Sequence, residues 1–287
     1  MNYKMVGRVL GMVLLCLAGL MLVPLLAGII YGENVRPFVL CIALSLALGL
    51  GLASIKPDST DLFARDGFLA VGLAWMLMSL LGALPYILSG DIPDFVDALF
   101  ESVSGFSTTG ATVLTDVEKL SRSCMLWRLL SQWIGGMGVL VFMLAVMPMS
   151  GEHSMHIVRA EFPGPTVGKL VPRVRETAKR LYLCYVGMTP LESGLLPSGG
   201  MSIYEALGHA FASAGTGGFS TRNASLGEFN SLYIEVVATV FELLFSVNFY
   251  IYYCILTGRA RSALRNEELH CFIGIVLFAV VSIAINL

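Results

Sequence analysis

The sequence predicts an all-α polytopic membrane protein with about seven transmembrane helices. Of the 287 residues, 56% are hydrophobic and 13% are charged, whereas soluble domains carry about 25% charged residues. Several apolar runs are long enough to cross a bilayer, and two short apolar segments each end in a loop rich in Gly, Ser and Thr. The formal net charge of −2 argues against a basic surface, so we expect no nucleic-acid partner.

The apolar runs give the candidate spanning helices, because about 20 apolar residues cross a bilayer as a helix. In chain order they are residues 9–30, 37–55, 67–88, 125–147, 181–196, 232–256 and 269–287. A short polar turn joins the first two runs, which predicts an antiparallel hairpin within residues 1–60. The fifth run is the weakest, because Pro190 and Glu192 interrupt it. Residues 151–180, before that run, form a long polar linker rich in Lys and Arg.

The Lys and Arg residues predict the orientation of the chain, because they favour the cytoplasmic side of a membrane protein. With the N-terminus in the cytoplasm, the basic linker 151–180 and the arginines at 259–265 also lie inside. Most of the cations then share that side. This arrangement holds only if each short apolar segment enters and leaves the membrane on the same face. Both short segments are therefore predicted to be re-entrant.

The two short segments form an internal repeat. Residues 98–112 read ALFESVSGFSTTGAT, and residues 206–220 read ALGHAFASAGTGGFS. Each copy runs from a half-length helix into a loop of small and hydroxyl residues, and each lies between two spans. The chain crosses the membrane twice between the copies, so they are parallel and can surround an axis along the membrane normal. We predict span–loop–span repeats at 61–150 and 181–258.

The two loops are predicted to bind a cation. A helix that ends at membrane depth directs its partly negative C-terminal end toward the loop, and Gly and Thr allow successive carbonyls to face one axis. Rings of carbonyls replace the hydration shell of a potassium ion in selectivity filters. The counterpart of Gly110 in the second loop is either Gly217 or Gly218. The predicted contact residues are Thr108, Thr109 and Gly110 in the first loop and Gly215, Thr216, Gly217 and Gly218 in the second.

Further polar residues lie near these loops in the sequence. Glu101, on the first half-length helix, is predicted either to support the filter or to make an ordinary structural hydrogen bond. Arg128 lies near the start of the next span, one helical turn before Gln132. It either pairs with Glu101 or extends to the lipid headgroups. Asn248, after the second loop, either faces the ion path or bonds to a neighbouring helix.

The first loop and the span after it carry a specific resemblance. The sequences GFSTTGAT at 105–112 and LWRLLSQWIGGMG at 126–138 resemble the Trk/Ktr potassium transporter superfamily, and most closely the membrane subunits of bacterial Trk potassium uptake systems. HAF at 209–211, GGFST at 217–221 and VNF at 247–249 resemble the second repeat of those subunits. The resemblance extends over nearly the whole chain.

The resemblance implies four span–loop–span repeats around one ion path, preceded by two helices. It implies potassium uptake across the bacterial inner membrane, passive or driven by the gradient and gated from the cytoplasmic side, with potassium as substrate and no covalent cofactor. It also implies a homodimer and a nucleotide-binding regulatory subunit on the cytoplasmic face. Residues 259–287 resemble the start of a third repeat, so the chain is expected to be the N-terminal part of a longer protein.

Two other functions fit a helical membrane protein of this composition. One is a non-conducting scaffold or sensor that keeps the same fold. The other is an intramembrane enzyme, for which the best candidates are Glu192, Glu101 and His209. The sequence lacks the HExxH and GxSxG motifs and paired intramembrane aspartates, so we expect no enzymatic activity. The six cysteines are scattered singly through apolar segments, which predicts packing roles rather than a zinc site.

Overall fold

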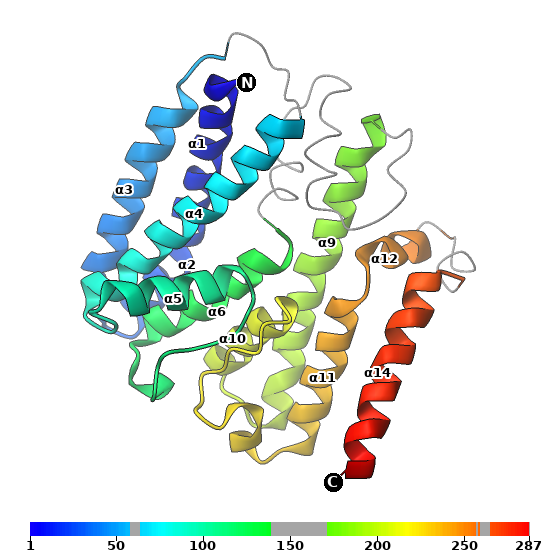
Figure 1. The fold of residues 1–287 in the computed structure, drawn as a ribbon. Helices are drawn as coiled ribbons and strands as arrows, with labels where there is room; N and C mark the ends of the chain where they lie inside the picture. The colour runs from blue at the N-terminus through cyan, green and yellow to red at the C-terminus, as the bar shows by residue number, and fades with distance from the viewer. Residues whose placement is uncertain (58–63, 139–170, 257, 259–264, 287) are drawn as a thin grey trace.

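In the computed structural model the chain folds as a bundle of helices (Figure 1). The structure describes residues 1–57, 64–138, 171–256, 258 and 265–286, and all regular structure in these ranges is helical. The predicted all-α fold class is therefore confirmed for this part of the chain. The α-helices are α1 (Tyr3–Leu20), α2 (Leu22–Ile30), α3 (Arg36–Ala53), α4 (Ala64–Ser89), α5 (Phe95–Phe106), α6 (Arg122–Gly136), α9 (Val171–Leu195), α10 (Ile203–Ala214), α11 (Leu232–Ser246), α12 (Phe249–Leu256) and α14 (Glu267–Asn286). Short 3-10 helices are η1 (Val117–Lys119), η3 (Leu196–Gly199) and η4 (Ser225–Phe229).

In the N-terminal hairpin, α1 and α2 form the first arm and α3 forms the second, which packs against α1. Two glycines bring α1 and α3 close together, because a Cβ built on Gly11 would lie only 2.8 Å from the carbonyl oxygen of Gly49. The run predicted as one span, 9–30, is divided at Met21 into α1 and α2. Pro24 accounts for this division, since proline has no N–H to donate and its ring crowds the carbonyl four residues earlier.

The short helices α5 and α10 each lie between two longer helices in the sequence. Both begin at side-chain caps that satisfy free N–H groups of the first turn. Asp94 accepts hydrogen bonds from the N–H groups of Val96 and Asp97, and Ser202 and Glu205 form a capping box on α10. Helix α5 packs against α4 and α6, while α10 packs against α6, α9 and α11 (Figure 1). Helix α6 therefore contacts both short helices.

The run predicted as a single span at 232–256 is broken in the structure. Helix α11 ends at Ser246, the backbone of Val247 is extended, and α12 begins at Phe249. Asn248 lies in this break and donates a hydrogen bond of 2.9 Å to Glu268 on α14. Of the two roles predicted for Asn248, the structure places it in contact with a neighbouring helix.

The region around the basic linker also differs from the prediction. Helix α9 continues through Pro190, although this proline was expected to interrupt the span. Residues 171–180, predicted as the end of the linker, form the first turns of α9. The linker residues 151–170, and residues 139–150 of the span before them, lie outside the described residues.

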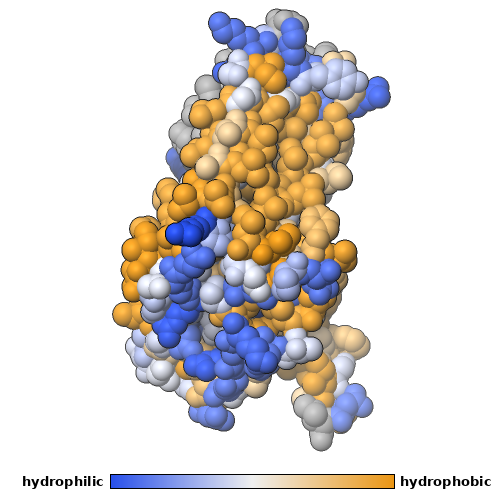
Figure 2. Space-filling model, turned by 90° about the vertical axis from the view of Figure 1, so that its left-hand side faces the viewer, coloured by the Kyte–Doolittle hydropathy of each residue, from blue (hydrophilic) through white to orange (hydrophobic). Residues whose placement is uncertain are grey.

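The surface of the bundle is that of a multi-pass membrane protein. Within the described ranges, four helical stretches are long and apolar enough to cross a membrane, namely Tyr3–Ile30, Arg36–Ala53, Arg65–Ser89 and Glu267–Asn286. Figure 2 shows a broad hydrophobic surface on the upper half of one face, with hydrophilic residues at the upper end and over much of the lower half. An exposed apolar surface of this extent marks a membrane or protein contact, because soluble monomers expose only small apolar patches.

Candidate ion pathway

The first predicted filter loop begins where α5 ends. Thr108 has a φ of +55° and Gly110 a φ of +75°. A positive φ is uncommon outside glycine, so the backbone at Thr108 is strained. The Thr108 N–H donates to the Gly105 carbonyl at 3.0 Å, and the Thr109 N–H donates to the Ser104 carbonyl at 3.0 Å. These bonds fold the chain back over the C-terminal end of the helix.

The second loop has the same geometry after α10. Thr216 has a φ of +50° and Gly218 a φ of +76°. The Thr216 N–H donates to the Ser213 carbonyl at 2.9 Å, and the Gly217 N–H donates to the Ala212 carbonyl at 3.1 Å. The two hydrogen bonds and the two positive torsions occur in the same order as in the first loop.

This shared geometry decides the register between the loops. Matching torsions and hydrogen bonds makes Gly218 the counterpart of Gly110. Gly217 then corresponds to Thr109, and Gly215 is the C-cap residue that follows α10. The sequence left Gly217 and Gly218 as equal candidates, because both residues are glycines. Their backbone torsions distinguish them, and these torsions are known only from the structure.

The two loops touch each other at their glycines. A Cβ built on Gly110 would overlap the carbonyl oxygen of Gly217, so the two backbones are in direct contact. A Cβ built on Gly217 would overlap the side-chain amide of Gln132 on α6. Neither glycine has room for a side chain. Two motifs that are far apart in the sequence thus meet at one place.

A buried ion pair lies behind the first loop. The Arg128 Nε on α6 donates to the Glu101 Oε2 on α5 at 2.9 Å, and the exposed fractions of the two side chains are 2% and 0%. The other oxygen of Glu101 accepts hydrogen bonds from the Val113 N–H at 2.8 Å and from the Thr112 hydroxyl. The pair therefore connects α6 to the segment that leaves the first loop.

Arg128 also contacts the second loop. Its Nη1 donates to the Ser220 carbonyl at 3.3 Å, and its guanidinium carbon lies 3.5 Å from the centre of the Phe219 ring. One turn further along α6, the Gln132 Oε1 accepts a hydrogen bond of 3.2 Å from the Phe219 N–H. One face of α6 thus holds both loops. The one-turn spacing of Arg128 and Gln132 was visible in the sequence, but their contact with the second loop was not predicted.

His209 occupies in α10 the position that Glu101 occupies in α5. Both lie in the penultimate turn of their helix, and both reach the segment that leaves their own loop. The His209 Nε2 lies 3.3 Å from the Thr221 hydroxyl and 3.4 Å from the Ser220 hydroxyl. The equivalent side-chain position therefore anchors each loop, with a carboxylate in one repeat and an imidazole in the other.

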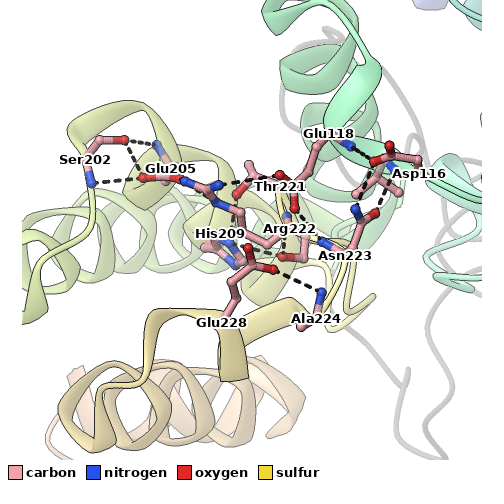
Figure 3. Close-up of polar contacts among 12 residues, drawn as sticks. Asp116, Glu118, Ser202, Glu205, His209, Thr221, Arg222, Asn223, Ala224 and Glu228 are labelled. Atoms are coloured by element: carbon pink, nitrogen blue, oxygen red, sulfur yellow. Dashed lines mark hydrogen bonds and ion pairs between the residues drawn. The ribbon is translucent and has the colours of Figure 1, made fainter.

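A second polar cluster ties together the segments that follow the two loops (Figure 3). Arg222 lies after the second loop, and its Nη2 is 2.7 Å from the Glu205 Oε1 on α10. The Arg222 Nη1 is 3.6 Å from the Glu118 Oε2 on η1. Asn223 donates from Nδ2 to the Asp116 Oδ1 at 2.8 Å. We call Asp116, Glu118, Glu205, Arg222 and Asn223 the outer clamp.

Hydrogen bonds within the outer clamp shift the pKa values of its ionisable side chains. The hydrogen bond from Asn223 lowers the pKa of Asp116. Partial burial by itself raises the pKa of Glu205, but the hydrogen bonds from Ser202 and Arg222 outweigh that effect, so the pKa is lowered. The same contact with Glu205 raises the pKa of Arg222. All three groups are therefore charged at neutral pH.

The residues considered for an enzyme lie on three different helices. Glu192 is buried on α9, Glu101 is paired with Arg128, and His209 is close to two hydroxyl groups. Among the residues that the structure describes, no group of three or more His, Cys, Asp or Glu side chains is arranged to hold a metal ion. Glu101 and His209 instead contact the segments that leave the two loops.

Comparisons with known proteins identify the family of the chain. The family described as TrkH, cation transport protein, matches residues 33–281. The Trk system potassium uptake protein TrkH of Escherichia coli (strain K12) is 37% identical, covering 98% of this chain and 59% of that protein. The Trk system potassium uptake protein TrkG of the same strain is 34% identical, covering 91% of this chain and 55% of that protein.

A solved structure shows the same fold. The crystal structure of the potassium transporter TrkH from Vibrio parahaemolyticus matches with a TM-score of 0.82 and 31% identity, covering 98% of this chain and 58% of that one. The chain thus spans a little over half the length of the relatives that it matches. Because the family match covers most of the sequence, the chain belongs to the TrkH family of cation transport proteins.

Proposed function

We propose that the chain takes part in potassium uptake across the bacterial inner membrane, and that its two loops form half of a four-loop selectivity filter. The observation that carries the proposal is the shared backbone geometry of the loops at 108–110 and 216–218, which meet at Gly110 and Gly217. The choice of potassium is supported by the relatives, which are named as potassium uptake proteins. The other half of the filter would come from two further repeats, as the family resemblance implies.

In the proposed transport step, no covalent bond is made or broken. A potassium ion leaves its hydration shell and takes backbone carbonyls of the two re-entrant loops as ligands. The C-terminal ends of α5 and α10 lead into these loops, and helix C-termini carry a partial negative charge that favours a cation. Transport is passive or follows the ion gradient, with a gate on the cytoplasmic side of the loops.

Glu101 and Arg128 are proposed to keep the filter in shape. Arg128 is bonded to Glu101 behind the first loop and to the Ser220 carbonyl in the segment after the second loop. The pair is almost completely buried, so water does not weaken the interaction. A filter that is held from both repeats resists the closer approach of its carbonyls to a smaller cation.

The test is potassium uptake by a bacterium that lacks its own potassium uptake systems and produces this protein from its intact gene. We expect Gly110→Ala to abolish uptake, because the added Cβ overlaps the Gly217 carbonyl and Gly110 has a positive φ. Gly90→Ala is the matched control. Gly90 also has a positive φ, of +83°, but a Cβ there meets no atom within 4 Å.

Both alanine variants carry the same backbone strain of about 1–2 kcal/mol. Only Gly110→Ala disturbs the proposed filter, so Gly90→Ala should retain uptake at equal amounts of protein in the membrane. Equal uptake by the two variants would show that Gly110 is not part of the ion path. No potassium uptake by the unaltered protein would favour a non-conducting scaffold or sensor.

The proposed assembly is a homodimer with a nucleotide-binding regulatory subunit on the cytoplasmic face, and the N-terminus of the chain lies in the cytoplasm. The dimer and the regulator are supported by the family resemblance. The orientation is supported by the Lys and Arg residues of 151–180 and 259–265, which the sequence predicts to lie on the side of the N-terminus. Purification of the protein in mild detergent, followed by measurement of its mass, would test the dimer.

A further inference from the structure

The side-chain amide of Gln132 has a determined orientation. The side chain is completely buried on α6, and its Oε1 accepts the hydrogen bond from the Phe219 N–H at 3.2 Å. A backbone N–H needs an oxygen acceptor, so the reverse orientation of the amide would place two donors against each other. The position of the Nε2 group follows from this bond.

The Nε2 group of Gln132 has no hydrogen-bond partner within the described part of the chain, although it is fully buried. Buried amide donors nearly always have a partner. A Cβ built on Gly217 would overlap the Gln132 Nε2. A Cβ built on Gly110 would lie 3.7 Å from the same nitrogen and would overlap the Gly217 carbonyl oxygen. The free donor and this carbonyl therefore lie near each other, where the two loops meet.

We propose that Gln132 is a positioning residue of the filter, and that its Nε2 group donates a hydrogen bond to the Gly217 carbonyl when no ion occupies that carbonyl. This inference rests on the proposed function, in which the loop carbonyls bind potassium. In the ion-bound filter the Gly217 carbonyl faces the ion. In the empty filter the peptide between Gly217 and Gly218 rotates and turns the carbonyl to the amide.

The local backbone permits this rotation. Gly217 and Gly218 have no Cβ, so the peptide between them turns with little steric hindrance. Gly218 already has a φ of +76°, and a Cβ there would meet no atom within 4 Å, so the space beside it is open in the part of the chain described. Thr109, the counterpart of Gly217 in the first loop, carries a side chain. The first loop therefore lacks the two consecutive glycines that allow this movement.

The rotation makes the amide a competitor of the ion. An ion enters the site only if its bond to the Gly217 carbonyl outweighs the hydrogen bond from Gln132. The hydrogen bond stabilises the empty filter, which is the common starting state for every ion. Removal of the donor should therefore raise the affinity for potassium, and the KM of potassium uptake should fall.

The first variant is Gln132→Met, which keeps the length of the side chain and removes the donor. Its matched control is Thr189→Val. The Thr189 hydroxyl accepts a hydrogen bond of 3.0 Å from the Trp133 Nε1 on the same helix α6, so this control also removes a buried hydrogen bond. The KM of potassium uptake is measured in membrane vesicles that contain the protein produced from its intact gene.

We expect the KM for potassium to fall by about tenfold in Gln132→Met, the size expected when one buried hydrogen bond is lost. Thr189→Val should leave the KM unchanged, because Thr189 acts on helix packing. A KM in Gln132→Met that is no lower than in Thr189→Val overturns the proposal. The thermal unfolding of both variants in detergent shows whether they are destabilised to the same degree.

The second variant is Gln132→Leu, which removes the donor with a smaller apolar side chain. We expect the KM for potassium to fall in this variant as it does in Gln132→Met. An unaltered KM in Gln132→Leu shows that the donor has no role, and this variant decides the question if Gln132→Met does not reach the membrane. Absence of potassium uptake by the unaltered protein overturns the proposed function together with this inference, whereas normal uptake with an unchanged KM in the variants overturns the inference alone.

Discussion

Because the Glu101–Arg128 pair is buried, the loss of one partner and the loss of both should have different effects on stability. Removal of one partner of a buried pair leaves the other charge without compensation and costs about 3–5 kcal/mol, whereas replacement of both partners often costs little. Arg128 also donates to the Ser220 carbonyl, so its loss affects both repeats. The pair should therefore contribute more to the shape of the loops than to the total stability of the bundle.

We expect Arg128→Met to lower the free energy of unfolding by about 3–5 kcal/mol, because Glu101 is left charged in a buried site. The double variant Arg128→Met with Glu101→Gln should recover part of this loss. Unfolding in detergent, measured for the two single variants and the double variant, gives the coupling energy. Strictly additive effects would mean that Glu101 and Arg128 do not stabilise each other.

The outer clamp joins η1 to the segment that follows the second loop. Asn223 follows the second loop, and its Oδ1 accepts a hydrogen bond of 2.9 Å from the Val117 N–H at the start of η1. The Asn223 N–H donates to the Glu118 Oε1 at 3.2 Å. A single side chain and its backbone thus hold η1 in place, and η1 leads directly into α6, which contacts both loops.

Asn223→Ala should loosen η1, because the Val117 N–H loses its acceptor and Asp116 loses a donor. Hydrogen exchange of the amides at 116–119 should become faster, while exchange in α10 stays slow. Asn34→Ala is the control, since Asn34 accepts a hydrogen bond from the Arg36 N–H at a different loop. Unchanged exchange at η1 in Asn223→Ala would show that the ion pairs alone hold the clamp.

The pH dependence of the same exchange follows from the lowered pKa values of Asp116 and Glu205. A carboxylate whose pKa is lowered by folding contributes stability above its unfolded pKa, and that contribution disappears as the pH falls through the folded pKa. The outer clamp should therefore stay intact at neutral and mildly acidic pH and loosen only below about pH 4. Loosening near pH 6 would point to a different titrating group.

The arrangement of the helices in the bundle predicts which ends of the molecule share a side of the membrane. The N-terminus and the start of α9 lie at the same end of the bundle (Figure 1). We expect that end to face the cytoplasm. Single cysteines at Tyr3 (Tyr3→Cys) and Lys119 (Lys119→Cys) test this expectation, because both side chains are largely exposed, with exposed fractions of 69% and 81%.

A membrane-impermeant thiol reagent should label Lys119→Cys in intact spheroplasts and Tyr3→Cys only after the membrane is opened. The unaltered protein, with its own six cysteines, gives the background. The reverse pattern would place the N-terminus outside and contradict the orientation inferred from the Lys and Arg residues.

The apolar runs in the sequence were enough to locate most of the helices, but not the breaks within two of the runs or the start of α9. A half-length apolar segment that ends in small residues differs from a full span, so α5 and α10 could be located from the sequence. The contact of Arg128 and Gln132 with the second loop could not, because nothing in α6 indicates which element packs against it. The break at Val247 also escaped prediction, since neither Pro nor Gly marks it.

The first repeat has Glu101 where the second has His209, and this difference has a consequence for how such a protein evolves. In a ring of identical subunits every mutation is repeated in each copy, so a substitution must be tolerated at every equivalent position. Here two copies of one motif lie in a single polypeptide and diverge independently. One copy retains a carboxylate with an arginine partner, and the other carries an imidazole among hydroxyls. Two copies of one motif in a single chain can therefore differ in charge at a position that identical subunits would have to share.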